Sequence, residues 1–96
     1  MGIPEFLLIV LFGPLAEETF FRGFIFPALL NHFGLAGAVA TSSILFALSH
    51  GSIALMIPTL FAGVMLCLLY AWTRSLWSVW QAHALQNALA FMFVTV

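Results

Sequence analysis

Charged side chains are scarce in this sequence. Only 5% of the 96 residues are charged, while 65% are hydrophobic, whereas a soluble domain carries roughly 25% charged residues because its surface faces water. Two basic and three acidic residues cannot cover such a surface, and disordered segments are not this apolar. We therefore expect a multi-pass membrane protein, located in the cell membrane, or the core of one.

Basic residues and cysteines are few as well. With two basic residues and a net charge of −1, the chain offers no patch that could attract nucleic acid, so no nucleic-acid partner is expected. The single cysteine, Cys67, excludes an internal disulfide and any cysteine-rich metal site. It lies in a leucine-rich stretch, and we interpret it as a packing residue.

Long apolar segments dominate what is present. A membrane helix needs about 20 mostly apolar residues, and candidate spans run over residues 4–30, 35–49, 53–72 and 76–96, with turns at 31–34, 51–52 and 73–75. Pro14 and Pro27 should distort the first span. Strands are not expected, because open sheet edges cannot be satisfied in lipid. The prediction is an all-α bundle of about four transmembrane helices, forming a single domain over residues 1–96.

One turn has the features of a membrane interface. Trp72, Trp77 and Trp80 flank Arg74, as tryptophans do in the aromatic belts at the two membrane surfaces. We interpret them as anchors. Arg74 would place this turn on the cytoplasmic side, because positive charge in short loops favours that side.

Polar groups inside the spans are the exception that points to function, because such groups are costly in lipid and usually face a cavity. They are Glu17, Glu18 and Arg22 in the first span, His50 at the end of the second, and His83 and Asn87 in the fourth. At about 1.5 Å per residue, antiparallel helices bring them to overlapping depths. We expect them to form one site.

The spacing of these groups suggests their chemistry. Glu18 and Arg22 are four residues apart, so they can pair on one helix face and lower the cost of both charges. Glu17 then remains as a candidate general base. A water shared by Glu17 and His50 would be a hydroxide-like nucleophile.

His83 and Asn87 would stabilise the oxyanion that forms when this nucleophile attacks a carbonyl group. His83 and Asn87 are also four residues apart, and their two donors could form an oxyanion hole, which indicates hydrolysis of a carbonyl bond. Each group also has a structural alternative. Glu18 and Arg22 could form a purely structural ion pair, and His50 could cap its own helix. His83 and Asn87 could form hydrogen bonds that clamp two helices together. Glu17, His50 and His83 could also ligate zinc as a two-histidine, one-glutamate set, so a metal stays open.

Three motifs carry a family resemblance. Residues 17–22 match E-E-x-x-x-R, residues 46–50 match F-x-x-x-H, and residues 83–87 match H-x-x-x-N. In this order, and each on an apolar helix, they resemble the CPBP family. That family comprises the type II CAAX prenyl endopeptidases and bacteriocin-processing and immunity proteins, and is also called the Abi family.

The resemblance implies a role for each matched residue. Glu17 would activate water with His50 as its partner, His83 and Asn87 would form the oxyanion hole, Glu18 and Arg22 would hold the site in shape, and Phe46 would pack beside it. The glutamate-dependent mechanism of the family implies no cofactor.

The expected function is therefore that of an intramembrane glutamic endopeptidase. Its partners would be membrane lipid and a membrane-tethered peptide or protein substrate, either a prenylated CAAX-type C-terminus or a leader peptide. The alternatives are a zinc-dependent intramembrane protease and a non-catalytic membrane scaffold or immunity factor. Family members are usually longer than 96 residues. The alternatives are therefore a core truncated relative to them, a subdomain, or a subunit that is completed by association with further helices or with itself.

Overall fold

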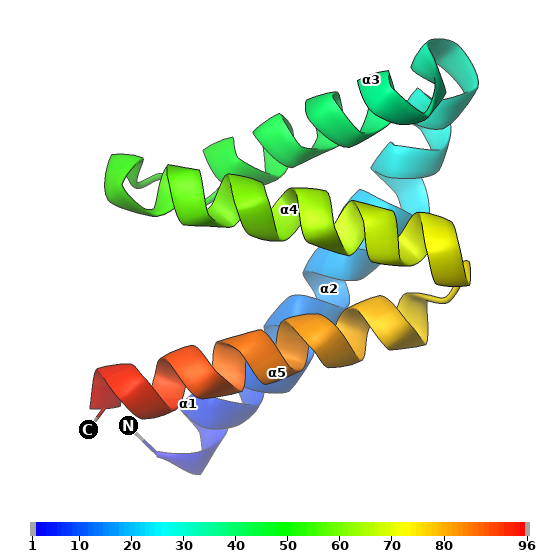
Figure 1. Cartoon of the computed structure of the whole chain (residues 1–96). Coiled ribbons are helices and arrows are strands. Elements are labelled where there is room, and N and C mark those ends of the chain that lie inside the picture. Colours follow the sequence, from blue (N-terminus) through cyan, green and yellow to red (C-terminus); the bar gives the residue numbers. More distant parts are fainter. Residues whose placement is uncertain (1, 96) are drawn as a thin grey trace.

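The chain is helical throughout the part that the structure describes. The computed structural model describes the backbone of residues 2–95 and the side chains of residues 2–93, and no strand occurs in this range. The helices are α1 (Ile3–Leu7), α2 (Gly13–Phe20), α3 (Phe26–Leu48), α4 (Ile53–Thr73) and α5 (Leu76–Thr95), and two π-helical segments, η1 (Leu8–Phe12) and η2 (Phe21–Ile25), join the first three (Figure 1). The all-α prediction is confirmed.

The distortions expected at the two prolines take the form of these π-helical segments. Pro14 and Pro27 each lie two residues after one of them. The Gly13 amide donates to the Leu8 carbonyl, and the Phe26 amide donates to the Phe21 carbonyl, so both bonds reach back five residues. A proline ring clashes with the carbonyl four residues earlier and brings no N–H. The wider π turn accommodates both defects without ending the helix.

The first predicted turn is shorter than expected. Helical structure continues through residues 31–33, and the break lies at Gly34 alone, with φ 74° and ψ −177°. This φ is open to glycine because it has no Cβ. After Gly34 the helix changes direction, and the rest of α3 runs back along α4 (Figure 1).

The helices form two antiparallel pairs that meet at a small core. The later part of α3 packs along α4, and α5 packs along η1 and α2 (Figure 1). Between the pairs lies an apolar cluster with one residue from each of η2, α3, α4 and α5: Phe21, Phe46, Leu66 and Val79. This cluster lies next to the polar groups that the sequence singled out, so it holds in place the elements that carry them.

By length and composition, two helices in the described part could cross a membrane. They are the broken helix Ile3–Leu48 and the helix Ile53–Thr73, and in each only 17% of the most apolar window is buried inside the protein. Their apolar side chains thus face outward, as lipid-facing side chains do. The count of four spans stays a prediction, because α5 forms where the fourth span was expected but is not one of these two. Residue 96 lies outside the described residues.

Candidate active site

A buried ion pair forms the inner part of the site. Glu18 on α2 and Arg22 on η2 are 1% and 0% exposed, and Arg22 Nη1 donates to Glu18 Oε2 at 3.4 Å. Arg22 Nη2 also donates to the backbone oxygen of Gly63 on α4 at 2.8 Å. Its guanidinium carbon lies 4.5 Å from the ring centroid of Phe46, a cation–π contact. The predicted Glu18–Arg22 pair is confirmed, and its contacts join α2 and η2 to α3 and α4.

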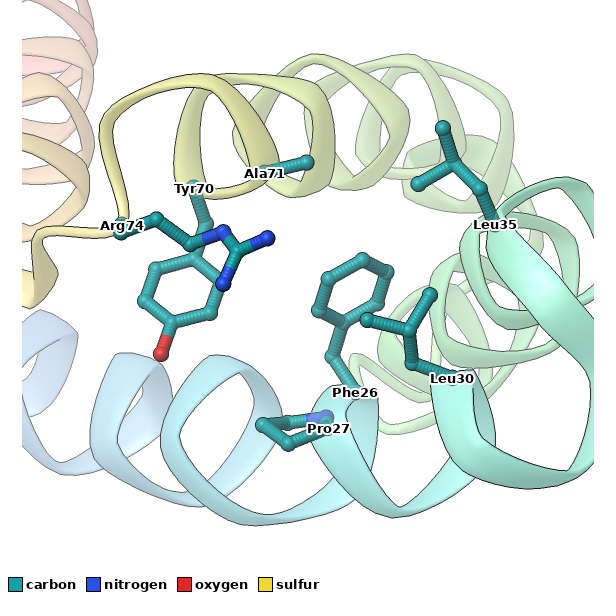
Figure 2. A pocket seen from close by; sticks show the side chains of 7 residues that line it. All are labelled: Phe26, Pro27, Leu30, Leu35, Tyr70, Ala71 and Arg74. Carbon is teal, nitrogen blue, oxygen red and sulfur yellow. The ribbon is translucent and has the colours of Figure 1, made fainter.

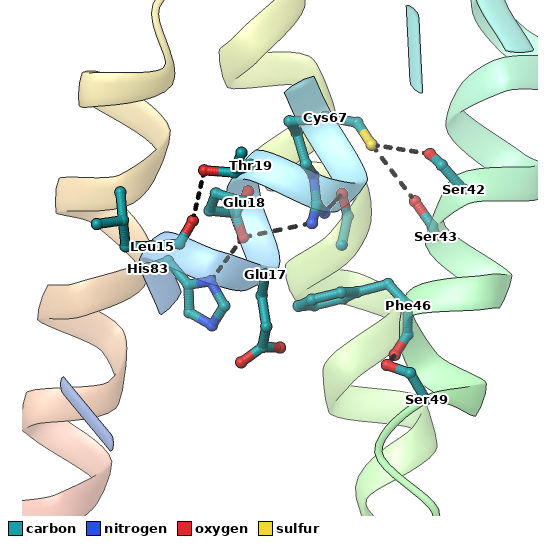
Figure 3. Close-up of polar contacts among 12 residues, drawn as sticks. Leu15, Glu17, Glu18, Thr19, Ser42, Ser43, Phe46, Ser49, Cys67 and His83 are labelled. Carbon is teal, nitrogen blue, oxygen red and sulfur yellow. Dashed lines mark hydrogen bonds and ion pairs between the residues drawn. The ribbon is translucent and has the colours of Figure 1, made fainter. Parts of the chain in front are cut away.

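Glu18 has a second partner that the sequence did not indicate. His83 Nδ1 on α5 lies 2.6 Å from Glu18 Oε2 (Figure 3). A carboxylate held beside Arg22 accepts hydrogen bonds only, so Nδ1 carries a proton and Nε2 is the free ring nitrogen. The four-residue spacing of His83 and Asn87 indicated a shared helix face, but spacing within one helix says nothing of a partner on another.

Glu17 and His50 form the outer part of the site. The Glu17 side chain leaves α2 in a different direction from Glu18 (Figure 3). Glu17 Oε2 lies 3.7 Å from His50 Nε2, and the two side chains are 35% and 29% exposed. This separation is longer than a direct hydrogen bond. The two residues come together as predicted, but with a gap between them.

The backbone sets the orientation of the His50 ring. His50 lies just after the end of α3, and its Nδ1 atom is 2.9 Å from the backbone oxygen of Phe46. A carbonyl oxygen only accepts, so Nδ1 carries a proton, and when the ring is neutral Nε2 presents a lone pair toward Glu17. Phe46 also packs against both histidines, with ring centroids 4.9 Å from His50 and 5.8 Å from His83. Phe46 thus packs against two of the residues that the sequence singled out.

Asn87 is tied to the π-helical segment η1. Its side-chain nitrogen donates to the backbone oxygen of Ile9 at 2.9 Å. In a regular helix this oxygen would accept from the Gly13 amide, which here donates to Leu8 instead. The next residue, Pro14, has no N–H to offer. One N–H of Asn87 thus satisfies a carbonyl freed by the π turn, and the second N–H is left for the site.

Two adjoining cavities connect these groups. One, of about 350 Å³, is lined by Phe46, His50, His83 and Asn87 among others. The other, of about 550 Å³, is lined by Glu17, His50 and Asn87 among others. The cavities share His50 and Asn87, so the four residues predicted to be catalytic face connected space.

The candidate zinc ligands are not assembled. Within the described residues, no three His, Cys, Asp or Glu side chains are grouped so that they could hold a metal ion. His83 turns its Nδ1 atom to Glu18, while Glu17 faces His50. The proposed set of Glu17, His50 and His83 is therefore not a preformed metal site.

Comparison with known proteins agrees with the motifs. Residues 1–89 match the family model described as type II CAAX prenyl endopeptidase Rce1-like. The chain is 39% identical over 99 aligned residues to the membrane-embedded CAAX protease MroQ of Staphylococcus aureus (strain USA300), an alignment that covers 95% of this chain and 40% of that protein. It thus spans about 40% of the length of this curated relative. No solved structure matches it. Because the family model covers nearly the whole sequence, the chain belongs to the type II CAAX prenyl endopeptidase Rce1-like family.

Proposed function

We propose that this chain is the catalytic core of a membrane-embedded endopeptidase that activates water with Glu17 and His50. The observation that carries the proposal is the gap of 3.7 Å between Glu17 Oε2 and His50 Nε2 at the edge of a cavity. Family membership favours peptide hydrolysis over other reactions of activated water.

The nucleophile would be one water bound across this gap. With His50 Nδ1 donating to the Phe46 carbonyl, both atoms that face the gap accept hydrogen bonds. A water there would donate one proton to each and turn its lone pairs toward the cavity. As the oxygen attacks the peptide carbonyl, a proton passes to the Glu17–His50 pair, which returns it to the leaving amine.

His83 and Asn87 would stabilise the oxyanion. Asn87 would use the N–H that does not bond to Ile9. His83 Nε2 donates only when the ring carries both protons, since its Nδ1 proton is directed to Glu18. The buried Glu18 carboxylate supplies the negative charge that this form of the ring needs, much as a buried aspartate does for the histidine of a serine protease.

Glu18 and Arg22 would be positioning residues. Both are buried and line neither of the two cavities, so neither is expected to touch substrate. Glu18 orients His83, and Arg22 holds Glu18 while its other nitrogen is fixed by the Gly63 carbonyl. A substitution at either position should act on catalysis through His83.

The substrate would be a membrane-tethered peptide. The matched family is described as prenyl endopeptidases acting on CAAX sequences, and the outward-facing apolar helices suit a lipid environment. We propose a prenylated CAAX-type C-terminus or a leader peptide as substrate, and membrane lipid as the surrounding partner. No cofactor takes part in this mechanism.

The test is cleavage of membrane-anchored fluorogenic peptides in liposomes, with and without prenyl groups. Wild type should cleave at least one class. Glu17→Gln, which keeps the shape of the side chain but cannot take up the proton, should lower kcat about 10²- to 10⁴-fold. Ser78→Ala, a change on α5 at a residue that lines neither of the two cavities, is the matched control and should cleave like wild type.

Three results would contradict the proposal. Glu17→Gln cleaving as wild type would remove Glu17 from the mechanism. Cleavage lost to a chelator and restored by zinc would favour the metal-dependent alternative. A folded wild-type chain that binds peptides of the panel without cleaving any would favour the scaffold or immunity role.

A further inference from the structure

A separate cavity lies near the turn between α4 and α5. Its volume is about 310 Å³, and it shares no lining residue with the two cavities of the candidate active site. Its walls are almost entirely apolar (Figure 2). They are formed by Phe26, Pro27, Leu30, Leu35, Tyr70, Ala71 and Arg74. The guanidinium of Arg74 is the one charged group among them.

Arg74 has no ionic partner within the described residues. In each ion pair there, the acidic partner is Glu17 or Glu18 of the candidate active site, and the basic partner is a residue other than Arg74. Figure 2 shows the guanidinium directed over the cavity, between Tyr70 and Phe26. This arrangement places an uncompensated positive charge at the rim of an apolar hollow.

The backbone conformation of Arg74 also suggests a function for its side chain. Arg74 ends α4 in the left-handed region, with φ 55° and ψ 28°, and its amide donates to the Tyr70 carbonyl at 2.7 Å. Glycine usually fills this position, because a Cβ makes the left-handed conformation unfavourable. An arginine accepted at a glycine position suggests a use for its side chain.

The surrounding tryptophans place the cavity at the depth of lipid headgroups. Trp72 and Trp77 flank Arg74 and are 84% and 67% exposed. Exposed tryptophans on apolar helices gather where headgroups meet acyl chains. Arg74 would then lie level with lipid phosphates, and the apolar walls would continue toward the acyl chains.

We propose that this cavity binds one acyl chain of an anionic phospholipid, whose phosphate pairs with Arg74. Arginine binds phosphate oxygens through two parallel N–H bonds. The volume of about 310 Å³ lies at the small end of ligand cavities, which begin near 300 Å³, so it suits part of one chain. This site does not depend on the proposed peptidase activity.

The test measures lipid binding to the purified chain in neutral detergent by native mass spectrometry. Phosphatidylglycerol and phosphatidylcholine are offered in equal amounts, and we expect one phosphatidylglycerol to be retained preferentially. Arg74→Gln should weaken its binding about fivefold, the equivalent of one cation at a lipid surface. Arg74→Lys should keep part of the preference, and Glu5→Gln, a charge change outside the cavity, should leave it intact.

Two further variants separate the cavity from simple charge attraction and from misfolding. Arg74→Gly should lose the preference while raising the midpoint of thermal unfolding, because glycine relieves the left-handed backbone. Leu35→Phe narrows the cavity at a half-exposed position and should weaken binding without changing charge.

Each contrary result has a definite meaning. An unchanged preference in Arg74→Gln would overturn the proposal. Weakening by Arg74→Gln but not by Leu35→Phe would reduce the site to surface attraction. Full competition by inorganic phosphate would make it a site for free phosphate and not for a lipid.

Discussion

Two adjacent glutamates on α2 lie in opposite environments. Glu18 is 1% exposed and binds both Arg22 and His83, whereas Glu17 is 35% exposed and has His50 3.7 Å away across a gap. Neighbouring residues on a helix point about 100° apart, so one carboxylate enters the core and the other faces a cavity. These environments suit the different tasks proposed for the two residues: Glu18 would hold the site together, and Glu17 would meet water.

Stability alone does not explain the buried ion pair of Glu18 and Arg22. Glu18 Oε1 and Arg22 Nε have no hydrogen-bond partner among the residues that the structure describes, and buried ion pairs that are incompletely bonded often contribute little net stability. A pair of this kind is better explained by what it orients. Here that is the His83 ring, on which the proposed oxyanion hole depends.

The largest loss of unfolding free energy is expected from removing the charge of the buried Glu18. Glu18→Gln leaves Arg22 buried without a counter-charge and should lower the free energy of unfolding by about 3–5 kcal/mol. Glu17→Gln should change it by no more than about 0.5 kcal/mol, because the side chain is partly exposed and lies 3.7 Å from its partner His50. Denaturant unfolding in detergent measures both. Equal losses would show that the two glutamates do not differ as described.

A smaller loss of unfolding free energy is expected from adding a Cβ at Gly63, whose backbone oxygen accepts from Arg22. A Cβ at Gly63 would lie 3.2 Å from Phe46 Cδ2 and 3.3 Å from Ser43 Cα. Gly63→Ala should therefore cost about 1–3 kcal/mol of unfolding free energy, as overpacked sites do. Gly23→Ala is the matched control. Its Cβ would meet the end of the Leu76 side chain at 3.4 Å, so it should not lose stability.

The smallest effect on stability is expected from removing both buried charges together. Glu18→Gln combined with Arg22→Met should unfold within about 1 kcal/mol of wild type, since no charge is left buried and unpaired. The amide oxygen can still accept from His83 Nδ1.

The activity of the same double variant tests the role given to Glu18. Without the carboxylate charge, the His83 ring should no longer carry both protons. Its Nε2 atom then cannot donate to the oxyanion, and kcat should fall about 10²-fold. The peptide assay measures this loss, with the unfolding midpoint as a control for folding. A stable double variant with full activity would limit Glu18 and Arg22 to packing.

Several features followed from the sequence because they depend on local geometry. The helical class, the distortions at Pro14 and Pro27, and the Glu18–Arg22 pair were predicted from residue type and spacing, and the structure bears them out. The first turn was predicted too long, because Asn31 and His32 are polar but lie within the helix, and Gly34 alone breaks it. Polarity indicated a turn there, but backbone conformation decided it.

The sequence by itself determined that the chain is apolar and helical, and its motifs indicated a family. It also predicted that the polar groups inside the spans lie together. Composition and helical spacing suffice for the helical class and the grouping of polar residues, and the family followed from the resemblance of its motifs. Only the tertiary structure decided that Glu18 receives the His83 ring, that Asn87 satisfies the Ile9 carbonyl, and that Glu17 is left facing His50 across a gap. These contacts join helices that are distant along the chain, and they depend on how α5 packs against α2 and η1, which spacing within one helix cannot specify.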